Sequence, residues 1–500
     1  MFPVEEKLDL IKAHLAGGRD VVLVAPPGSG KTTCVPSALL DEPWISGGKI
    51  LMLEPRRIAA RSAATYIAKK MGEAPGGTVG YQVRLERRTS RSTRLEIITE
   101  GLLTQRILSD MELKGVKLVV FDEFHERSVQ TDLAFALMLE IKKVFRPDLR
   151  IIVMSATLDA QEINEFLKGE IVVSEGRMFD VEKRYLGEIS PSSAVRIALK
   201  DTTADILVFL PGEKEIRQVK DKLSDVKSAE IIPLYGALSK EEQNRAFEPC
   251  GKRKVILSTS IAETSVTIPG IGCVIDSGLM RTAKFSPATG MSGLHTLPIS
   301  LDRAAQRQGR AGRVADGVCY KLWTQAKEAS LPHKAQPEVL VADLCHLVLS
   351  CALYGALRRD DICWLTAPPE GSWSQAVKLL KSLGALEQSG AITPRGEKMA
   401  QLPMHPRLAA MMLSGDRKGA FFAAVVEENA PSRETDVRHV PVKEKTKRLA
   451  EMFEKYLPES KTPMRSEGAL LMLAYPDRIA RRRANGTYRM VNGKGAYLDE

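Results

Sequence analysis

Long runs of apolar residues are absent from this sequence. No stretch approaches the roughly 18 apolar residues that a membrane-spanning helix needs, and the acidic start MFPVEEKLDLI lacks the apolar region of a secretion signal. The seven cysteines show no C-x-x-C spacing and lie among apolar residues, a pattern that predicts reduced, mostly buried thiols. No compositionally biased tract indicates disorder. The sequence therefore predicts a cytoplasmic protein with no membrane segment.

Positive charge is in excess, with 72 Lys and Arg against 62 Asp and Glu, a net charge of +10. The excess is uneven, because residues 431–500 hold 15 basic against 10 acidic residues, and RLERRTSRSTR (84–94) has five arginines and one acid. Basic segments suit a phosphate backbone, although each taken alone is also compatible with an ordinary solvated surface. A polyanionic partner is therefore expected.

Short β-branched runs alternate with helical stretches in two successive series, and 500 residues are too many for one hydrophobic core. Unbroken apolar strands of this kind belong to parallel sheets that are covered on both faces. The first series is DVVLVA at 20, KILMLE at 49, LEIIT at 95, VKLVVFDE at 116 and RIIVMSAT at 150. The second is DILVFLPG at 205, EIIPLYG at 230, KVILSTS at 254, GCVIDSG at 272 and VCYKLW at 318. Two α/β lobes of similar plan are predicted.

Helical periodicity replaces the strand signals after about residue 328. Residues 379–403 are an exception, because a helix there runs into the hairpin-like ALEQSGAIT, a pattern that fits a small winged-helix unit. Amphipathic helices are expected from residue 405 onward, and TYRMVNGKGAYLDE (487–500) begins a strand-rich stretch.

The stretch APPGSGKT (25–32) misses the phosphate-loop pattern G-x-x-x-x-G-K-[ST] by one residue, because Ala25 stands where the first glycine is expected. It nevertheless joins a buried strand to a helix, and a small residue suffices at the loop entry. Gly28 and Gly30 allow backbone N–H groups to face the β-phosphate, Lys31 carries a charge to the β/γ oxygens, and Thr32 offers a hydroxyl to Mg²⁺. The predicted ATP-binding residues are Gly28, Ser29, Gly30, Lys31, Thr32 and Asp122.

Two adjacent carboxylates, Asp122 and Glu123, end the buried strand in VVFDEFHE. Alternation along the strand would send them in different directions from its carboxyl end. Asp122 is the Mg²⁺ candidate and Glu123 the general base for the attacking water, with Thr32, Asp122 and Glu123 forming the predicted metal shell. Alone, such a pair is also compatible with a helix cap. The preceding phosphate loop favours the catalytic interpretation.

The stretch QRQGRAGR (306–313) supplies two arginines and an amide. If it is helical, Gln306, Arg310 and Arg313 lie four and three residues apart and project from one stripe. Two guanidinium groups and an amide suit a γ-phosphate and an attacking water, the role of arginine fingers. The catalytic candidates are therefore Glu123, Gln306, Arg310 and Arg313. Hydrolysis would then require both lobes to meet.

The ordered blocks APPGSGKT, LEPRR, TEG, DEFH, SAT, VFLPG, STSIAETSVT and QRQGRAGR resemble the motifs of superfamily 2 helicases of the DEAH/RHA group. DEFHERS, LEPRRIAARSAA and residues 382–413 are most similar to the bacterial HrpB-type ATP-dependent helicases. The resemblance covers nearly the whole chain. It implies two tandem RecA-like parallel-sheet domains, a winged-helix unit and a helical, ratchet-like domain, with boundaries at 1–178, 179–327, 328–400 and 401–500.

The resemblance also implies an ATP- and Mg²⁺-dependent enzyme that moves 3′-to-5′ along single-stranded RNA, as a monomer, and separates duplexes. Carried over by position, the nucleic-acid contacts are Arg57, Arg84, Thr99 and Thr259. Ser155 and Thr157 would couple hydrolysis to strand binding, and a separating hairpin would lie near residues 281–298. Such contacts go to phosphate and sugar, and they position a strand without reading its sequence.

Three features depart from the family pattern. Ser260 stands where asparagine is usual, and Tyr66 and Leu279 occupy the positions that sandwich the nucleotide base in the wider group, so base selectivity is open. HrpB-type chains also continue into a further β-rich portion. Three alternatives to an RNA helicase remain: an RNA-dependent ATPase that remodels protein–RNA complexes without processive unwinding, a DNA helicase, and a binding protein whose nucleotide site acts only as a clamp.

Overall fold

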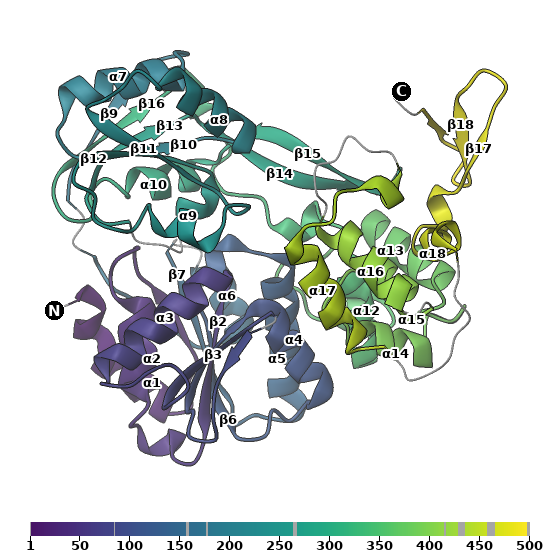
Figure 1. The fold of residues 1–500 in the computed structure, drawn as a ribbon. Coiled ribbons are helices and arrows are strands. Elements are labelled where there is room, and N and C mark those ends of the chain that lie inside the picture. Colours follow the sequence, from purple (N-terminus) through teal and green to yellow (C-terminus); the bar gives the residue numbers. More distant parts are fainter. Residues whose placement is uncertain are drawn as a thin grey trace. The chain divides into compact units, whose positions relative to one another are not determined.

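The protein is described by a computed structural model that covers residues 2–84, 86–156, 160–176, 179–263, 268–414, 417–428, 436–457 and 466–497 (Figure 1). The chain divides into two compact units. The first unit comprises residues 1–283 and 294–338, and the second comprises residues 284–293 and 339–500. The first unit contains two lobes, each built on a parallel sheet.

The first lobe has an eight-stranded sheet in which only the β3–β4 pair is antiparallel. In spatial order its strands are β4 (Glu86–Arg88), β3 (Val79–Val83), β5 (Leu95–Thr99), β2 (Lys49–Glu54), β6 (Val116–Phe121), β7 (Arg150–Ser155), β1 (Val21–Val24) and β8 (Glu170–Val173). Its helices are α1 (Leu8–Ala16), α2 (Lys31–Leu39), α3 (Arg57–Lys70), α4 (Glu100–Ser109), α5 (Val129–Val144) and α6 (Ala160–Leu167). Because β1, β2, β5 and β6 are parallel, the loops that follow them leave the same edge of the sheet.

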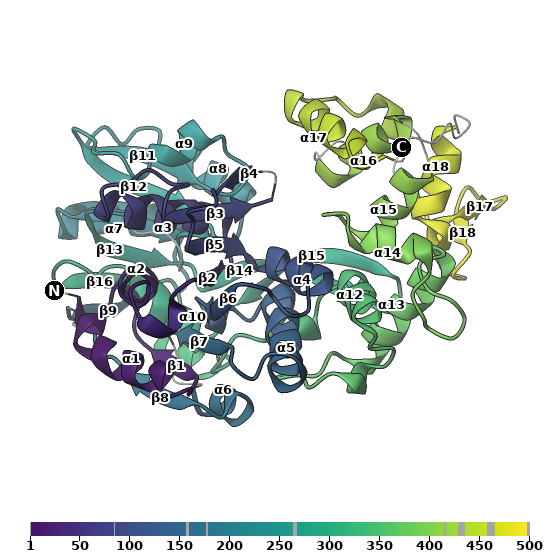
Figure 2. The ribbon, with the colours of Figure 1, turned by 90° about the horizontal axis from the view of Figure 1, so that it is seen from below.

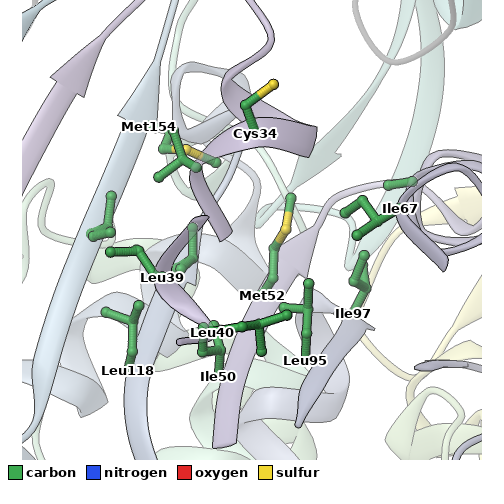
Figure 3. Close-up of a cluster of buried hydrophobic side chains, with 14 of the residues drawn as sticks. Cys34, Leu39, Leu40, Ile50, Met52, Ile67, Leu95, Ile97, Leu118 and Met154 are labelled. Carbon is green, nitrogen blue, oxygen red and sulfur yellow. The ribbon is translucent and has the colours of Figure 1, made fainter. Parts of the chain in front are cut away.

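Helices cover both faces of this sheet (Figure 1). Side chains of α1, α2 and α3 form one apolar cluster with alternate strand residues, and Leu39 of α2 lies among Ile50, Leu118 and Met154 (Figure 3). On the other face, the ring of Phe121 at the end of β6 meets that of Phe135 in α5, edge to face, with centroids 5.7 Å apart. The strands that lead to the phosphate loop and the carboxylate pair are therefore fixed from both sides.

The second lobe has a six-stranded, fully parallel sheet. In spatial order its strands are β11 (Ala229–Leu234), β12 (Arg253–Ser258), β10 (Asp205–Phe209), β13 (Ile271–Asp276), β16 (Gly317–Lys321) and β9 (Val181–Tyr185). Its helices are α7 (Pro191–Asp201), α8 (Glu213–Lys222), α9 (Lys240–Asn244), α10 (Leu301–Gln308) and α11 (Gln325–Ala329). Two apolar clusters, one on each face, repeat the plan of the first lobe.

A two-stranded sheet of β14 (Leu279–Ser286) and β15 (Met291–Pro298) follows β13. It coincides with the hairpin expected near residues 281–298. Its tip, residues 284–293, belongs to the second unit, where the Phe285 N–H donates to the carbonyl of Val341 at 2.7 Å.

The second unit is mostly helical and ends in a small antiparallel sheet (Figure 2). Its helices are α12 (Cys345–Tyr354), α13 (Glu370–Ser382), α14 (Pro394–Ala400), α15 (Pro406–Leu413), α16 (Arg417–Glu428), α17 (Glu444–Glu454) and α18 (Glu467–Ala474). The sheet comprises β17 (Ala480–Arg482), β18 (Tyr488–Met490) and β19 (Gly495–Ala496). The hairpin-like segment expected after α13 is reduced to one antiparallel bridge, Leu386 to Ile392.

All ten strands expected from apolar runs are confirmed, as is their parallel pairing within each lobe. The expected strand-rich end is also confirmed, although it begins at Ala480, before residue 487. The sequence did not indicate β3, β4, β8 and β9, which lie toward the sheet margins. β4, β8 and β9 carry exposed residues, whereas β3 is mostly buried. The three predicted boundaries between the four domains stay predictions.

Candidate nucleotide-binding and catalytic site

The loop between β1 and α2 has the geometry of a phosphate site. Gly28 and Gly30 adopt φ values of +86° and +88°, and Gly30 caps α2, so the free N–H groups at the start of this helix face one region. The Ala25 side chain is fully buried and its N–H donates to the Ser155 carbonyl at 2.9 Å, so a small residue fits at the loop entry. The segment is thus suited to hold an anion.

The predicted carboxylates lie directly against this loop. The Thr32 hydroxyl donates to Asp122 Oδ2, and Lys31 Nζ lies 3.3 Å from Glu123 Oε2. Lys31, Asp122 and Glu123 are all buried. Strand alternation is the wrong explanation for the directions of the two acids, because β6 ends at Phe121 and Glu123 turns into left-handed geometry, with φ +49°. The tight turn, rather than the pleat of the strand, separates them.

The pKa values of the two acids move apart. Burial raises the pKa of Asp122 to about 6, with a further contribution from the Glu123 carboxylate. Burial alone would also raise the pKa of Glu123, but Lys31 and His125 outweigh it and hold this pKa at about 2. Glu123 is therefore the ionised partner of the Lys31 ammonium in the absence of nucleotide.

Two neighbours of this pair were not predicted. His125 accepts the Ala156 N–H at Nδ1 (3.3 Å), which leaves Nε2 to carry the proton 3.4 Å from Glu123 Oε2. Glu54, the last residue of β2, is buried, and burial together with Asp122 raises its pKa well above the usual range. Among the described residues, its Oε2 atom has no hydrogen-bond partner. The only sequence signals are the histidine of DEFH and the acid of LEPRR.

The oxygen donors present fit a magnesium ion. The Thr32 hydroxyl and an Asp122 carboxylate oxygen are already in contact, both are hard ligands, and a further buried carboxylate oxygen on Glu54 lacks a partner among the described residues. The loop that precedes them is suited to phosphate oxygens, the usual remaining ligands of this ion.

The helix predicted over QRQGRAGR is only partly present. α10 ends at Gln308, and Arg310 and Arg313 lie in the turn that follows, so the three predicted residues do not form one helical stripe. The glycines at 309 and 312 make a continued helix unfavourable. The turn nevertheless buries Arg310, whose Nε donates to the Glu263 carbonyl at 3.0 Å.

The Glu123 carboxylate in the first lobe interacts electrostatically with both arginines in the second lobe. Burial lowers the pKa of Arg310, and Arg313 adds to this effect, whereas the Glu123 carboxylate opposes it. The pKa of Arg313 is likewise lowered by burial and raised by Glu123. Gln306 lines a cavity of about 20 Å³ that it shares with Arg56 and His125. The structure therefore brings all four predicted catalytic residues to the region of the phosphate loop.

Arg56, which precedes the predicted strand contact Arg57, joins the lobes directly. Its NH1 atom donates to the carbonyls of Ser260 and Ile261, each at 3.1 Å, and its NH2 atom lies 3.3 Å from a carboxylate oxygen of Glu126. Ser260 thus contributes its backbone to this contact, so the contact does not depend on having asparagine at that position.

The residues predicted to contact nucleic acid lie at strand ends. Arg57 is exposed at the start of α3, after β2, and Thr99 is the last residue of β5, at the same edge of the first sheet. Thr259 follows β12 in the second lobe. Arg84 is half-buried beside β3. For Thr99 and Thr259, the side chain makes no hydrogen bond to cap the helix that it precedes.

The remaining predicted positions differ in exposure. Ser155 is fully buried at the end of β7, next to the loop entry, and Thr157 lies outside the described residues. The two base-sandwich positions hold Tyr66, 48% exposed, and the half-buried Leu279.

Glu100, directly after Thr99, allows this edge of the first sheet to be tested through the pH dependence of stability. It is buried, accepts from Ser128 at 2.5 Å and from Thr131, and burial raises its pKa from 4.5 to about 7. Because the folded-state pKa lies above the unfolded one, its contribution to stability is complete below pH 4.5 and is lost as the pH rises toward 7. The loss is on the order of 3 kcal/mol at most.

Glu100→Gln removes this titration. We expect the melting temperature of the variant, relative to that of the unmodified protein, to rise between pH 5 and pH 8, as measured by calorimetry at both pH values. A constant difference between the two proteins would show that Glu100 is ionised throughout.

In the described part of the chain, no helix is both long and apolar enough to cross a membrane.

Comparisons with known proteins agree with this geometry. Residues 8–166 match the DEAD/DEAH box helicase family, residues 191–315 the helicase conserved C-terminal domain, and residues 376–404 the winged-helix part of the helicase associated domain (HA2). These matches fall on the first sheet, the second sheet and the α13–α14 segment, in that order. They confirm two tandem RecA-like lobes followed by a winged-helix unit.

Individual relatives match over almost the whole chain. The ATP-dependent RNA helicase HrpB of Escherichia coli is 40% identical across 99% of this chain and 64% of its own length. The probable ATP-dependent RNA helicase DHR2 of Saccharomyces cerevisiae is 36% identical across 84% of this chain and 60% of its own. The chain thus spans somewhat less than two thirds of these curated relatives.

The crystal structure of the Escherichia coli DEAH/RHA helicase HrpB superposes with a TM-score of 0.91 at 38% identity. The match covers 100% of this chain and 67% of that one. A second crystal structure, of the DExH-box NTPase HrpB of the same organism, gives a TM-score of 0.86 at 38% identity. On its fold, its ordered motifs and these relatives, the chain belongs to the HrpB-type DEAH/RHA helicases.

Proposed function

We propose that this chain is an RNA-stimulated ATPase that translocates 3′-to-5′ along single-stranded RNA and separates duplexes. The observation that carries the proposal is the meeting of three parts: the phosphate loop, the buried Lys31–Glu123 pair from the first lobe, and Arg310 from the second. A site completed by both lobes allows hydrolysis to change the contact between them.

In the proposed site, N–H groups of the loop hold the phosphates, and Lys31 leaves Glu123 for the β/γ oxygens. Thr32 and Asp122 would hold Mg²⁺, which would neutralise phosphate charge. Without its ammonium partner, Glu123 becomes more basic and can accept a proton from the attacking water. His125, whose Nε2 lies 3.4 Å from Glu123 Oε2, positions this carboxylate. ATP itself thus activates the general base.

Gln306, Arg310 and Arg313 would complete the site from the second lobe. The arginines stabilise charge that develops on the transferred phosphoryl group, and Gln306 orients water. The burial of Arg310 favours this role, because a desolvated guanidinium interacts strongly with an anion.

The strand would contact Arg57, Thr99 and Thr259, with Arg84 in support. Arg57 and Thr99 share one sheet edge, and Thr259 directly precedes the backbone that Arg56 binds, so movement of the strand and of the site can be linked. Ser155, next to the loop entry, is the proposed coupling residue, together with Thr157.

The relatives in Escherichia coli and Saccharomyces cerevisiae are named as an ATP-dependent RNA helicase and a probable one, which supports the choice of RNA and ATP. The 3′-to-5′ polarity, the monomeric state and the cytoplasmic location stay predictions.

The proposal is tested by steady-state ATPase measurements with and without single-stranded RNA and DNA of matched length, at a stated salt concentration, together with strand displacement. RNA-stimulated turnover with displacement supports it. Turnover without displacement favours a remodelling ATPase, stronger stimulation by DNA favours a DNA helicase, and no phosphate release with any RNA favours a clamp.

The three-stranded sheet at the end of the described chain offers a further strand contact. Arg481 lies opposite Arg489 in the β17–β18 pair, and Arg482 and Arg483 adjoin it, all exposed. Like charges opposite each other destabilise a sheet, and among the described residues none of these arginines pairs with an acid. An RNA phosphate would supply the missing counter-charge.

Replacing Arg481, Arg482 and Arg483 by alanine should weaken RNA binding and make the plot of log K against log salt shallower by about 2, since each single-strand contact contributes about 0.7. Fluorescence anisotropy with a labelled RNA at several salt concentrations measures the slope. The triple lysine variant is the control and should keep it. An unchanged slope in the alanine variant would remove this sheet from the strand path.

A further inference from the structure

The N-terminal segment, residues 2–7, lies against the phosphate loop. It contains η1 (Pro3–Lys7) and precedes α1 (Figures 1 and 2). The Val4 N–H donates to the Ser29 carbonyl at 3.2 Å, and a Cβ built on Gly30 would lie 2.8 Å from Cβ and Cγ of Phe2. The segment therefore contacts two consecutive loop residues, one through its backbone and one through a ring.

Val4 anchors the segment. Its side chain is fully buried in the cluster that includes Ala25, Cys34 and Val35, so it packs on the same core as the loop entry and α2. Phe2 is held differently: it is 37% exposed, and its N–H donates to Glu5 Oε2 at 2.8 Å. The Phe2 ring is thus a partly exposed group that lies against the loop at Gly30.

The phosphate loop is flexible enough that such contacts affect its conformation. Two of its residues, Gly28 and Gly30, combine left-handed φ values with the high conformational freedom of glycine, so an unsupported loop would lose much entropy on binding a nucleotide. The two glycines differ, however. A Cβ at Gly28 would meet nothing within 4 Å, whereas one at Gly30 would meet Phe2. Phe2 thus packs where the side chain of Gly30 is missing.

Ser29, between the glycines, is also held by the N-terminal segment. It is 1% exposed, and its carbonyl accepts the Val4 N–H. A buried carbonyl without a donor is costly, so this hydrogen bond favours the observed loop conformation over others. Neither Phe2 nor Val4 belongs to the motif itself.

We infer that Phe2 and the Val4 N–H are positioning groups for ATP: they hold the phosphate loop in its binding conformation before nucleotide arrives. The inference rests on the proposed ATPase function. Because it concerns loop order before binding, the effect falls on the affinity for ATP, while the chemistry at Glu123 is unchanged.

Phe2→Ala is the test, in the full chain with saturating RNA. We expect the KM for ATP to rise about 3- to 10-fold with kcat within twofold, and hydrogen exchange of the amides at 28–32 to accelerate before ATP is added. Phe2→Leu keeps an apolar side chain over Gly30. Its KM for ATP and its exchange rate at 28–32 should therefore stay close to those of the unmodified protein. Phe145→Ala is the matched control: Phe145 is 46% exposed and follows α5, and its loss should change neither readout.

The outcomes are separable from those of the proposed function. If the unmodified protein does not hydrolyse ATP, the proposed function fails, and hydrogen exchange at 28–32 still decides the inference. An unchanged exchange rate in Phe2→Ala overturns it, as does an unchanged KM in an active protein. A fall in kcat alone, or equal effects of Phe2→Ala and Phe145→Ala, overturns it as well.

Discussion

Glu123→Gln should lower kcat for ATP hydrolysis about 10³-fold while the protein still binds ATP at least as tightly as before. The loss follows because an amide cannot accept a proton from the attacking water. The retained affinity follows from the geometry: Lys31 lies 3.3 Å from Glu123, so in the unmodified protein the phosphates compete with this carboxylate for the ammonium. Glutamine weakens the competition and removes a negative charge next to the triphosphate.

The measurement combines single-turnover hydrolysis with a fluorescent-nucleotide titration. Glu96→Gln is a matched control, because Glu96 is also buried in the first lobe but pairs with Arg106. That variant should keep kcat within about twofold once its folding is confirmed. Hydrolysis by Glu123→Gln at the unmodified rate would remove Glu123 from the catalytic role, and equal losses in both variants would point to a structural effect.

Lys31→Ala should weaken ATP binding about 30- to 100-fold, the value of one strong charge-assisted hydrogen bond. A second effect follows from burial. Lys31 is 3% exposed and is the ammonium that lies among Asp122, Glu123 and Glu54, so its removal leaves three buried acids together. Removing one partner of a buried ion pair costs about 3–5 kcal/mol of folding stability. The cost should be smaller at pH 6 than at pH 8, because protonated carboxyl groups need no counterion.

Isothermal titration with ATP and Mg²⁺ measures the first effect, and calorimetric melting at both pH values measures the second. Lys142→Ala is the control, since Lys142 forms an ion pair with the buried Asp20 in the same lobe, outside the loop. It should lose stability without losing ATP affinity. Undiminished affinity in Lys31→Ala would contradict the assignment of the phosphate loop.

Combining Lys31→Ala with Glu123→Gln in one protein tests the interaction between the two residues. If Glu123 restrains Lys31 in the free protein, adding Glu123→Gln to Lys31→Ala should recover part of the lost stability, because one uncompensated carboxylate is removed. Their effects would then not add, as expected for residues in direct contact.

Most of the fold could be predicted because each lobe repeats one local pattern. Apolar runs such as KILMLE and RIIVMSAT are buried on both faces, and that burial makes them readable as parallel strands. β4 (ERR) and β9 (VEKRY) escaped this reasoning because they lie at sheet edges, where one neighbour is missing and polar side chains are allowed. QRQGRAGR was harder still, since its glycines end the helix after Gln308.

The sequence by itself determined the phosphate loop, the Asp122–Glu123 pair and the order of the motifs, because each is encoded in contiguous residues whose chemistry does not depend on distant neighbours. Only the tertiary structure decided that Glu54 joins the two acids, that His125 Nε2 lies 3.4 Å from Glu123 Oε2, that Arg56 binds the backbone of the other lobe, and that Phe2 covers Gly30. The contact of Glu54 with the two acids arises from strand order, with β2 beside β6, and the contacts of His125 and Arg56 arise because buried polar groups must find partners. Neither the strand order nor these buried contacts can be predicted from a local pattern in the sequence.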